Sequence, residues 1–366
     1  MLHYGFPSDR SRWGGPFLAA LVAAVLALAL AACSQPSGGA PAAQPAGSAP
    51  GGQSAAPQAA PAKPAAGGSP VEIRVGHGFA AEENLWLMAA RPDVTPNQGK
   101  AYTLTMTAFR GNADRLTAFD GGQLDVATSA APSTLFAAEQ GVPLKIVASI
   151  AREKQGSFNT TYLALEDSGI RSAADVKGKT IGIVDFKSAT ELWARAAIES
   201  AGLNPDRDVS FVVVPFPGMG EALRARRIDV GVFPEPFVTQ EKGRGGVVQV
   251  WTAKTGVPFE EELLDLIVRP DFLNQNREAL RAFLADFVAA TKYYLDHTEE
   301  AKLALVDKGF VQTPPDVYVK LADYYREPSG RVTTEGLDKE QDLHVKLGWQ
   351  RSKLNLSELV DQSLLP

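Results

Sequence analysis

The segment Lys179–Thr190 (KTIGIVDFKSAT) carries a lysine and two hydroxyl side chains directly after a short apolar run. That run, Thr180–Val184, is mostly β-branched, which is typical of a strand buried on both faces. Ser188 precedes an amphipathic run and Glu191 follows three residues later, which is the spacing of a capping box at the start of a helix. Free backbone N–H groups and the helix dipole favour negative charge at such a start. The segment therefore predicts a turn that can bind a small anionic group.

The same turn has a second interpretation that the residues leave open. Lys187 adds a full positive charge and Ser188 adds a hydroxyl, as an anion site requires. An ordinary strand-to-helix turn with a good cap has the same composition. The elements around the turn favour the functional interpretation.

Four other segments are expected to reach the same place, because ligands in α/β folds bind at the carboxyl ends of the strands. They are Gly76–Phe79, Thr128–Ala131, Phe216–Met219 and Pro234–Phe237. The ligand-binding residues predicted from all five segments are His77, Gly78, Phe79, Thr128, Ser129, Phe186, Lys187, Ser188, Ala189, Thr190, Phe216, Glu235 and Phe237. The phenylalanines at strand ends indicate a ligand with an organic part.

Each of these residues also has an ordinary structural role open to it. His77 can be a satisfied loop histidine, Thr128 and Ser129 can cap the following helix, and each phenylalanine can belong to the core. Glu235 can be a surface carboxylate near a turn, or an acceptor for an amine or hydroxyl group of a ligand. We hypothesise that Lys187 and Glu235 together bind a ligand with an acidic end and a basic or hydroxyl end.

The composition is that of a globular protein. The chain has 366 residues, of which 45% are hydrophobic and 21% charged, so it is long enough for a large core in two domains. The net charge is −6 and there is no basic run, so nucleic acid is not an expected partner.

The first 33 residues have the pattern of a targeting segment. Arg10 and Arg12 precede an apolar stretch, Phe17–Leu30, which is short for a membrane span. Leu30-Ala31-Ala32-Cys33 then resembles the bacterial lipobox, in which the cysteine is lipidated after cleavage. Residues 1–33 are thus predicted to be a lipoprotein signal peptide with lipidation at Cys33, the only cysteine. A plain secretory signal cleaved near Ala32 is the alternative.

Residues 34–70 are almost entirely Ala, Pro, Gly, Ser and Gln. This composition cannot bury a core and predicts a disordered linker. An anchor and a linker before a folded domain predict an extracytoplasmic protein held at the cell membrane.

The order of predicted elements repeats along the rest of the chain. The strands expected in the two sets are Val71–Val75, Tyr102–Ala108, Leu124–Ala127 and Leu144–Ile150, then Thr180–Val184, Val209–Val214, Ile228–Val232 and Val247–Trp251. Helices are expected between consecutive strands. This self-similarity predicts two α/β lobes, each a mainly parallel sheet with helices on both faces.

One further strand is expected after each passage of the chain between the lobes. These strands are Thr161–Leu165 and Leu263–Val268, which puts the crossings near Arg152–Thr160 and Val257–Glu262. Lobe 1 is predicted to comprise residues 71–155 and 260–366, and lobe 2 residues 156–259. The helices expected after residue 270 are Asn276–Leu295, one capped by Thr313 with Pro314 at its first position, Asp338–Trp349 and Leu356–Leu365.

Four segments carry a resemblance to a known family. They are Gly121–Ile150, Ser172–Leu203, Arg227–Val238 and Leu354–Leu365. The chain resembles substrate-binding proteins of ABC importers, in the nitrate, sulfonate and taurine group and the thiamine-precursor group. The resemblance implies a two-lobed, type II periplasmic-binding-protein-like fold with a double-crossing hinge that closes on ligand. Such proteins commonly show Gly-Ser-Thr where this chain has Lys187-Ser188-Ala189.

Other classes of protein find little support in the sequence. Gly76–Ala81 fits the G-x-G-x-x-A dinucleotide fingerprint, but the next strand ends without the acidic residue that the fingerprint requires. The chain has no G-x-S-x-G and no H-E-x-x-H, and its four histidines are scattered. We therefore expect no enzymatic activity, no cofactor and no metal site.

The sequence as a whole predicts a lipid-anchored solute-binding protein, expected to be a monomer, that delivers its ligand to an ABC permease and its ATPase. A small organic anion such as a sulfonate or carboxylate is the expected ligand, and a pyrimidine-type thiamine precursor is the alternative. An enzyme or a sensory binding protein on the same fold is the alternative class.

Overall fold

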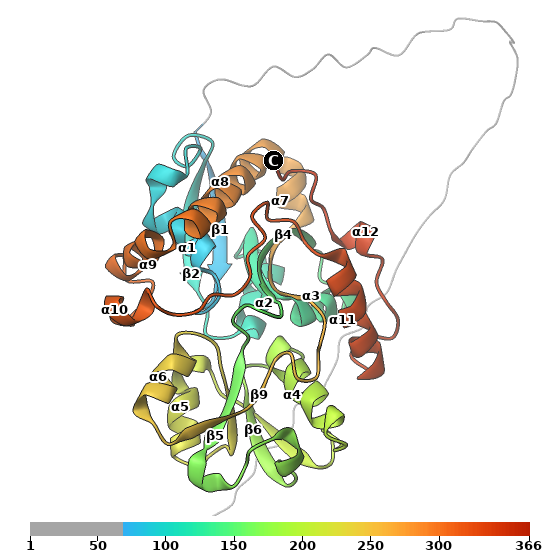
Figure 1. Ribbon diagram of the computed structural model, residues 1–366. Helices are drawn as coiled ribbons and strands as arrows, with labels where there is room; N and C mark the ends of the chain where they lie inside the picture. Colours follow the sequence, from blue (N-terminus) through green and yellow to red (C-terminus); the bar gives the residue numbers. More distant parts are fainter. Residues whose placement is uncertain (1–68) are drawn as a thin grey trace, which may run out of the picture. The chain divides into compact units, whose positions relative to one another are not determined.

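The computed structural model describes residues 69–366, which form two five-stranded β-sheets with helices packed around them (Figure 1). The predicted signal peptide, the lipidation of Cys33 and nearly all of the predicted linker lie outside the described residues. Between residues 69 and 366, no helix combines the length and the apolar character needed to cross a bilayer.

The first sheet has the strand order β2-β1-β3-β10-β4. Its strands are β1 (Val71–His77), β2 (Tyr102–Ala108), β3 (Val126–Ala130), β4 (Lys145–Glu153) and β10 (Glu261–Val268). β1 pairs in parallel with β2 and β3, whereas β10 runs antiparallel to both β3 and β4. All eight residues of β10 are buried, because this strand lies inside the sheet with helices over it.

The second sheet has the strand order β7-β6-β8-β5-β9. Its strands are β5 (Thr161–Leu165), β6 (Lys179–Ile183), β7 (Val209–Val213), β8 (Val230–Phe233) and β9 (Val247–Thr252). β6 pairs in parallel with β7 and β8, and β5 runs antiparallel to β8 and β9. Its topology repeats that of the first sheet, which confirms the predicted pair of α/β lobes.

Each sheet is mixed, because one of its strands runs against the others. That strand is β5 in the second sheet and β10 in the first, and each follows a passage of the chain from one sheet to the other. β4 leads into β5 and β9 leads into β10, so the chain crosses twice, as the resemblance implies. The exact positions at which the predicted lobes divide remain a prediction.

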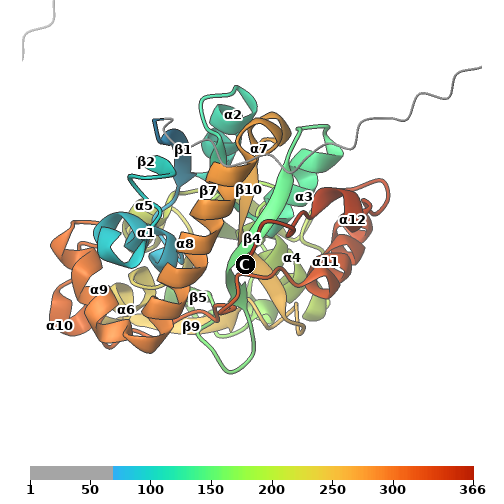
Figure 2. The same cartoon turned by 90° about the horizontal axis from the view of Figure 1, so that it is seen from above.

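Twelve α-helices are assigned in residues 69–366. They are α1 (Glu83–Ala90), α2 (Asn112–Asp120), α3 (Ala131–Glu139), α4 (Ala189–Ser200), α5 (Phe216–Arg224), α6 (Phe237–Arg244), α7 (Pro270–Gln275), α8 (Arg277–Asp296), α9 (Thr298–Asp307), α10 (Pro315–Tyr318), α11 (Thr334–Lys346) and α12 (Leu356–Leu359). Helix α8 packs beside α1, as Figure 2 shows from above. Its residues Leu280, Phe283 and Phe287 are fully buried, as their helical spacing predicts. Leu295, which the same pattern places on that face, is 40% exposed at the end of the helix.

The helices near the C-terminus differ from the sequence prediction. Helix α12 ends at Leu359 instead of Leu365, because Val360 is extended and forms a β-bridge with Ile146. Helix α11 begins at Thr334 instead of Asp338, since the Thr333 side chain accepts a hydrogen bond from the Gly336 amide and caps it there. Helix α10 begins at Pro315, so neither the predicted cap nor the predicted first position is correct.

Candidate functional site

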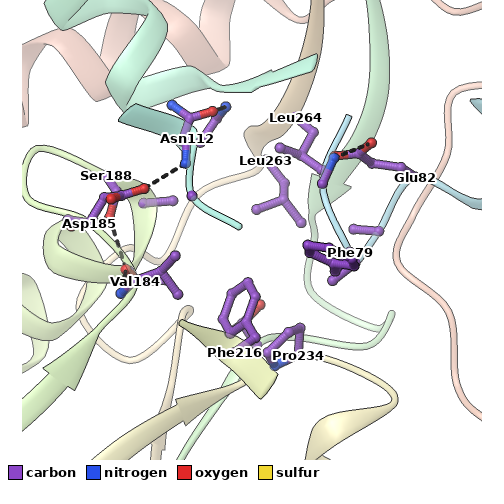
Figure 3. A pocket seen from close by; sticks show the side chains of 18 of the residues that line it. Phe79, Glu82, Asn112, Val184, Asp185, Ser188, Phe216, Pro234, Leu263 and Leu264 are labelled. Carbon is purple, nitrogen blue, oxygen red and sulfur yellow. Dashed lines mark hydrogen bonds between the residues drawn. The ribbon is translucent and has the colours of Figure 1, made fainter. Parts of the chain in front are cut away.

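A cavity of about 100 Å³ lies where loops from both sheets meet (Figure 3). Its lining includes the last residue of β3 and residues directly after β1, β2, β6 and β8, so it lies at the carboxyl ends of these strands. Leu263 and Leu264 of β10 complete the wall. All five segments predicted from the sequence contribute at least one residue to this lining.

Six of the predicted ligand-binding residues line the cavity. They are Gly78, Phe79, Ser188, Ala189, Thr190 and Phe216. Phe79 remains 41% exposed, whereas Ala189 and Thr190 are buried in the first turn of α4. The placement of these residues is now known, and their role in binding a ligand stays a prediction.

Three predicted residues lie behind the wall, close to the first sheet. His77 is buried, and Trp86 Nε1 donates a hydrogen bond to its Nδ1 at 3.1 Å. Thr128 and Ser129 are fully buried at the end of β3. Thr128 Oγ1 donates to Glu82 Oε1 at 2.9 Å, so its hydroxyl supports a wall residue.

Four predicted residues of the second sheet also lie away from the cavity. Lys187 Nζ lies over the rings of Phe136 and Trp349, and the Phe186 side chain is 56% exposed beside it. Both residues line a separate groove formed with α2 and α3. The remaining two back the wall: Phe237 stacks on Phe216 with ring centroids 5.9 Å apart, and Glu235 Oε1 accepts from Thr239 Oγ1. Burial raises the pKa of the Glu235 carboxyl.

The sequence prediction missed a buried charge network at the cavity. The Glu82 carboxylate accepts from the Gly78 amide at 2.9 and 3.0 Å, and Arg115 Nη1 lies 4.0 Å from Glu82 Oε1. Arg115 Nε donates to Thr128 O at 2.6 Å, and its Nη2 donates to Asn112 Oδ1 at 2.7 Å. Burial lowers the pKa of the Arg115 guanidinium. The two side chains lie far apart in the sequence, and each alone reads as an ordinary surface charge.

Aromatic side chains form much of the remaining wall. Trp193, Tyr324 and Phe109 line the cavity together with Phe79 and Phe216. Trp193 Nε1 donates to Glu261 Oε1 at 2.6 Å, which fixes the indole. These rings offer stacking surfaces to the organic part of a ligand.

The turn before α4 is built differently from the predicted capping box. Ser188 is the N-cap residue, but its Oγ donates to Asp185 O at 2.6 Å and makes no capping bond. Glu191 Oε2 accepts from the Lys187 amide at 2.6 Å, one residue before the expected donor. The capping-box prediction is therefore wrong, although the helix begins where it was expected.

The amide end of α4 faces the cavity. The first hydrogen bond inside the helix runs from Leu192 N to Ser188 O, so the amides of Ala189, Thr190 and Glu191 have no acceptor within the helix. Ala189 and Thr190 line the cavity. Such amides and the positive end of the helix dipole can bind an anionic group.

At the N-terminus of α2, the first amides already bind the carboxylate of Asp185. Its Oδ2 accepts from the Asn112 amide at 2.6 Å and lies 3.4 Å from the Ala113 amide. Figure 3 shows Asp185 and Asn112 facing each other across the cavity rim. Burial raises the pKa of the Asp185 carboxyl, and the two backbone hydrogen bonds act against that rise. Over the described range 69–366, no group of three or more His, Cys, Asp or Glu residues is placed to hold a metal ion.

Two sheets of equal topology, two crossings and a cavity at the strand ends define the two-lobed fold of the periplasmic-binding-protein type. The chain belongs to the NMT1-like family, which matches residues 66–306. The chain is 26% identical to the nitrate/nitrite binding protein NrtA of Nostoc sp. over 241 residues, which cover 61% of this chain and 52% of that protein. The chain thus spans about half the length of this curated relative.

Two further likenesses agree with the family. The bicarbonate transport ATP-binding protein CmpC of Synechocystis sp. is 27% identical over 274 residues, which cover 69% of this chain and 38% of that protein. The periplasmic aliphatic sulphonate binding protein SsuA from Escherichia coli has the same fold, with a TM-score of 0.64 and 17% identity over 80% of this chain and 93% of that one. The family and these relatives support a solute-binding role.

Proposed function

We propose that this chain is the extracytoplasmic solute-binding component of an ABC importer, which holds a small organic anion and delivers it to the permease and its ATPase. The observation that carries the proposal is the cavity at the strand ends, because it combines aromatic walls with the amide end of α4. Sulfonates and carboxylates pair an anionic group with an organic part, so we propose them as the ligand classes.

The charges around the cavity favour a single compact anionic group. Glu82 and Arg115 lie 4.0 Å apart and neutralise each other, so neither is free to pair with a ligand charge. The amides of Ala189 and Thr190 are left as the donors for an anion. A cavity of about 100 Å³ favours a small ligand.

A pyrimidine-type ligand is the second candidate, and the Asp185 carboxylate favours it. Asp185 lines the cavity, and a carboxylate can accept a hydrogen bond from the amino group of an aminopyrimidine. Trp193, Phe216 and Tyr324 provide flat faces for its ring.

The placement of His77 and Glu235 supports a binding role over an enzyme that would use this pair. Neither side chain lines the cavity. His77 Nδ1 accepts from Trp86 and Glu235 Oε1 accepts from Thr239 behind the wall. We propose in addition that the protein is a monomer anchored through a lipid on Cys33, that it binds no nucleic acid, and that it uses no metal or cofactor.

Thermal unfolding of the purified full chain against a ligand panel tests the proposal. The panel contains alkanesulfonates, taurine, aromatic carboxylates, nitrate, bicarbonate and aminopyrimidines. A ligand at about a hundred times its Kd stabilises the folded state by about 2.7 kcal/mol, which raises Tm by a few degrees. Ser210→Ala, at an exposed position of edge strand β7, is the control and should show the same shifts. A folded protein that responds to no member of the panel would overturn the proposed ligand classes.

A further inference from the structure

The N-termini of two helices, α4 and α2, reach the cavity, and they differ in whether their amides bind a carboxylate. The first-turn amides of α4 are unused inside the helix, whereas the first turn of α2 already binds the Asp185 carboxylate. We propose that Asp185 is a specificity residue of this binding protein, which occupies the anion position on α2 from the opposite lobe. It thereby holds the lobes together and denies that position to small inorganic oxyanions.

The contact joins elements of the two sheets. Asp185 lies between β6 and α4, which belong to the second sheet, and α2 lies between β2 and β3 of the first sheet. The carboxylate approaches within 2.6 Å of the Asn112 amide. Gly111 leaves room for this approach, because a Cβ there would make a tight contact of 3.0 Å with Asp185 Oδ2.

The position on α2 is suited to negative charge. The positive end of the helix dipole and the unused first-turn amides point at the carboxylate. Arg115 lies one turn further along and adds attraction, while Asp114 on the exposed side of the helix opposes it. The side chain of Asp185 therefore takes the place that an anionic ligand bridging the two lobes would take.

Other polar contacts also join the two lobes. Trp193 Nε1 on α4 donates to the buried Glu261 Oε1 on β10 at 2.6 Å. Ser133 Oγ donates to Lys187 O at 3.1 Å, and Gln240 Nε2 donates to Thr313 Oγ1 at 3.2 Å. Lys346 pairs with Glu199 at the surface, where ion pairs contribute little. Among these contacts, that of Asp185 places a carboxylate on the N-terminal amides of a helix of the other lobe, at the cavity.

This arrangement narrows the ligand class, and that part of the inference rests on the proposed function. An inorganic oxyanion such as nitrate has no organic part, so its binding energy must come from charge-assisted hydrogen bonds to the donors around it. Here only the α4 side is open, so a ligand must obtain the rest of its affinity from the aromatic walls. An organic anion can do so, and a bare oxyanion cannot.

The distance between the lobes tests the inference without any ligand. Spin labels at Glu278→Cys on α8 and Arg207→Cys near β7, in a Cys33→Ser background of the full chain, report closure by double electron–electron resonance. Asp185→Ala should reduce the closed population several-fold, and Gly111→Ala should do so from the other side of the contact. Asp114→Asn removes a carboxylate from the same helix turn without touching the other lobe and should leave the closed population intact. Equal distance distributions for all these proteins would overturn the proposal that Asp185 holds the two lobes together.

Added anions then test the specificity. Acetate or nitrate at tens of millimolar should restore the closed population of Asp185→Ala by filling the vacated position, and should not change that of the parent protein. Nitrate should bind Asp185→Ala at least tenfold more tightly than the parent in calorimetry. Equal nitrate binding by both proteins would overturn the specificity role. The closure measurement needs no natural ligand, so it stands even if the ligand panel fails.

Discussion

Lys187 has a backbone conformation that suits glycine. Its φ is +57°, in the left-handed region, where a residue with a Cβ is less stable by about 1 kcal/mol or more. Glycine adopts this conformation without strain, and the family resemblance implies glycine at this position. The Nζ of Lys187 lies 4.8 Å from the centroid of Phe136 and 5.5 Å from that of Trp349. These cation–π contacts offset part of the strain.

Replacement of Lys187 separates strain from ligand binding. Lys187→Gly relieves the strain and loses the ring contacts, so we expect its free energy of unfolding to stay within about 1 kcal/mol of the parent. Lys187→Ala keeps the strain and loses the same contacts, so it should be the less stable of the two in urea unfolding. Ligand affinity should change less than twofold in both, because Nζ lies outside the cavity. A tenfold loss would instead support the hypothesis that the Lys187 charge reaches the ligand.

Thr190 links the end of β6 to the start of α4. Its Oγ1 accepts from the Val184 amide at 3.0 Å and lies 2.8 Å from Ser188 Oγ. Thr190→Ala leaves the Val184 amide without this acceptor, so we expect a loss of about 1–2 kcal/mol in stability. Anion affinity should fall as well, because the turn before α4 loses the hydrogen bond between Val184 and Thr190 that positions it.

Thr190→Ser is the matched control, since it retains the hydroxyl. Denaturant unfolding and calorimetric titration of both variants should show the parent values for serine and losses for alanine. If serine and alanine behaved alike, the hydroxyl would have no part in positioning the turn.

At the scale of elements, β10 and α11 bring together carboxyl groups in the core. Glu261, Glu262 and Asp265 lie on β10, and Glu340 on α11 faces them. Burial raises the pKa of Glu261 and of Glu262 to about 7, even though Lys254 and Arg152 act against the rise. Among the described residues, neither Asp265 nor Glu340 has a hydrogen-bond partner for its carboxyl oxygens. Burial therefore holds the pKa of both well above the ordinary range.

These raised pKa values predict how stability depends on pH. A carboxyl whose pKa is higher in the folded state is bound to its proton more tightly there. Its contribution is complete below the ordinary value and is lost as pH rises toward the folded-state value. From about pH 5 upward, each such group lowers the free energy of unfolding by up to about 1.4 kcal/mol per pH unit.

Neutral isosteres should remove part of this dependence. Asp265→Asn and Glu340→Gln should be more stable than the parent at pH 8 and similar to it at pH 5, as measured by urea unfolding. Asp316→Asn, in the first turn of α10 and exposed, serves as the control with an unchanged profile. Parallel pH profiles for the core variants and the parent would contradict the assignment of protonated carboxyls to this core.

At the scale of the whole molecule, ion pairs of Arg152 join the two segments at which the chain passes from one sheet to the other. It lies at the end of β4, and its guanidinium pairs with Glu260 at 2.8 Å and with Glu262 at 3.0 Å at the start of β10. Its Nη2 also donates to Arg331 O. The crossing segments are thus tied to each other and to the C-terminal part of the chain.

Loss of Arg152 should be among the more damaging single changes. Arg152→Ala leaves Glu262 buried without its cation, and breaking such a pair costs about 3–5 kcal/mol. Arg152→Lys keeps the charge but not the fork of donors, so it should lose less. Denaturant unfolding of the three proteins gives the comparison. A loss below 1 kcal/mol for alanine would mean that the crossings are held by packing alone.

The sequence by itself determined the architecture. β-branched runs, turn residues and helical spacing are local patterns, and they placed every strand within a few residues of its observed bounds. The repeat of these patterns predicted two sheets of equal topology, and the carboxyl-end rule brought all five predicted segments to the cavity. The irregular segment after Leu359 was missed because Val360 pairs with Ile146, a partner more than two hundred positions away.

Only the tertiary structure decided which side chains face the cavity. His77, the last residue of β1, turns into the core and binds Trp86, whereas Gly78 directly after the strand lines the wall. Glu82, Arg115 and Asp185 come from three separate elements, and their role depends on contacts that no local pattern encodes. The same holds for Lys187, whose left-handed backbone directs its charge to Phe136 and away from the site. Local propensity fixes where elements begin and end, whereas packing between distant elements fixes what their side chains can bind.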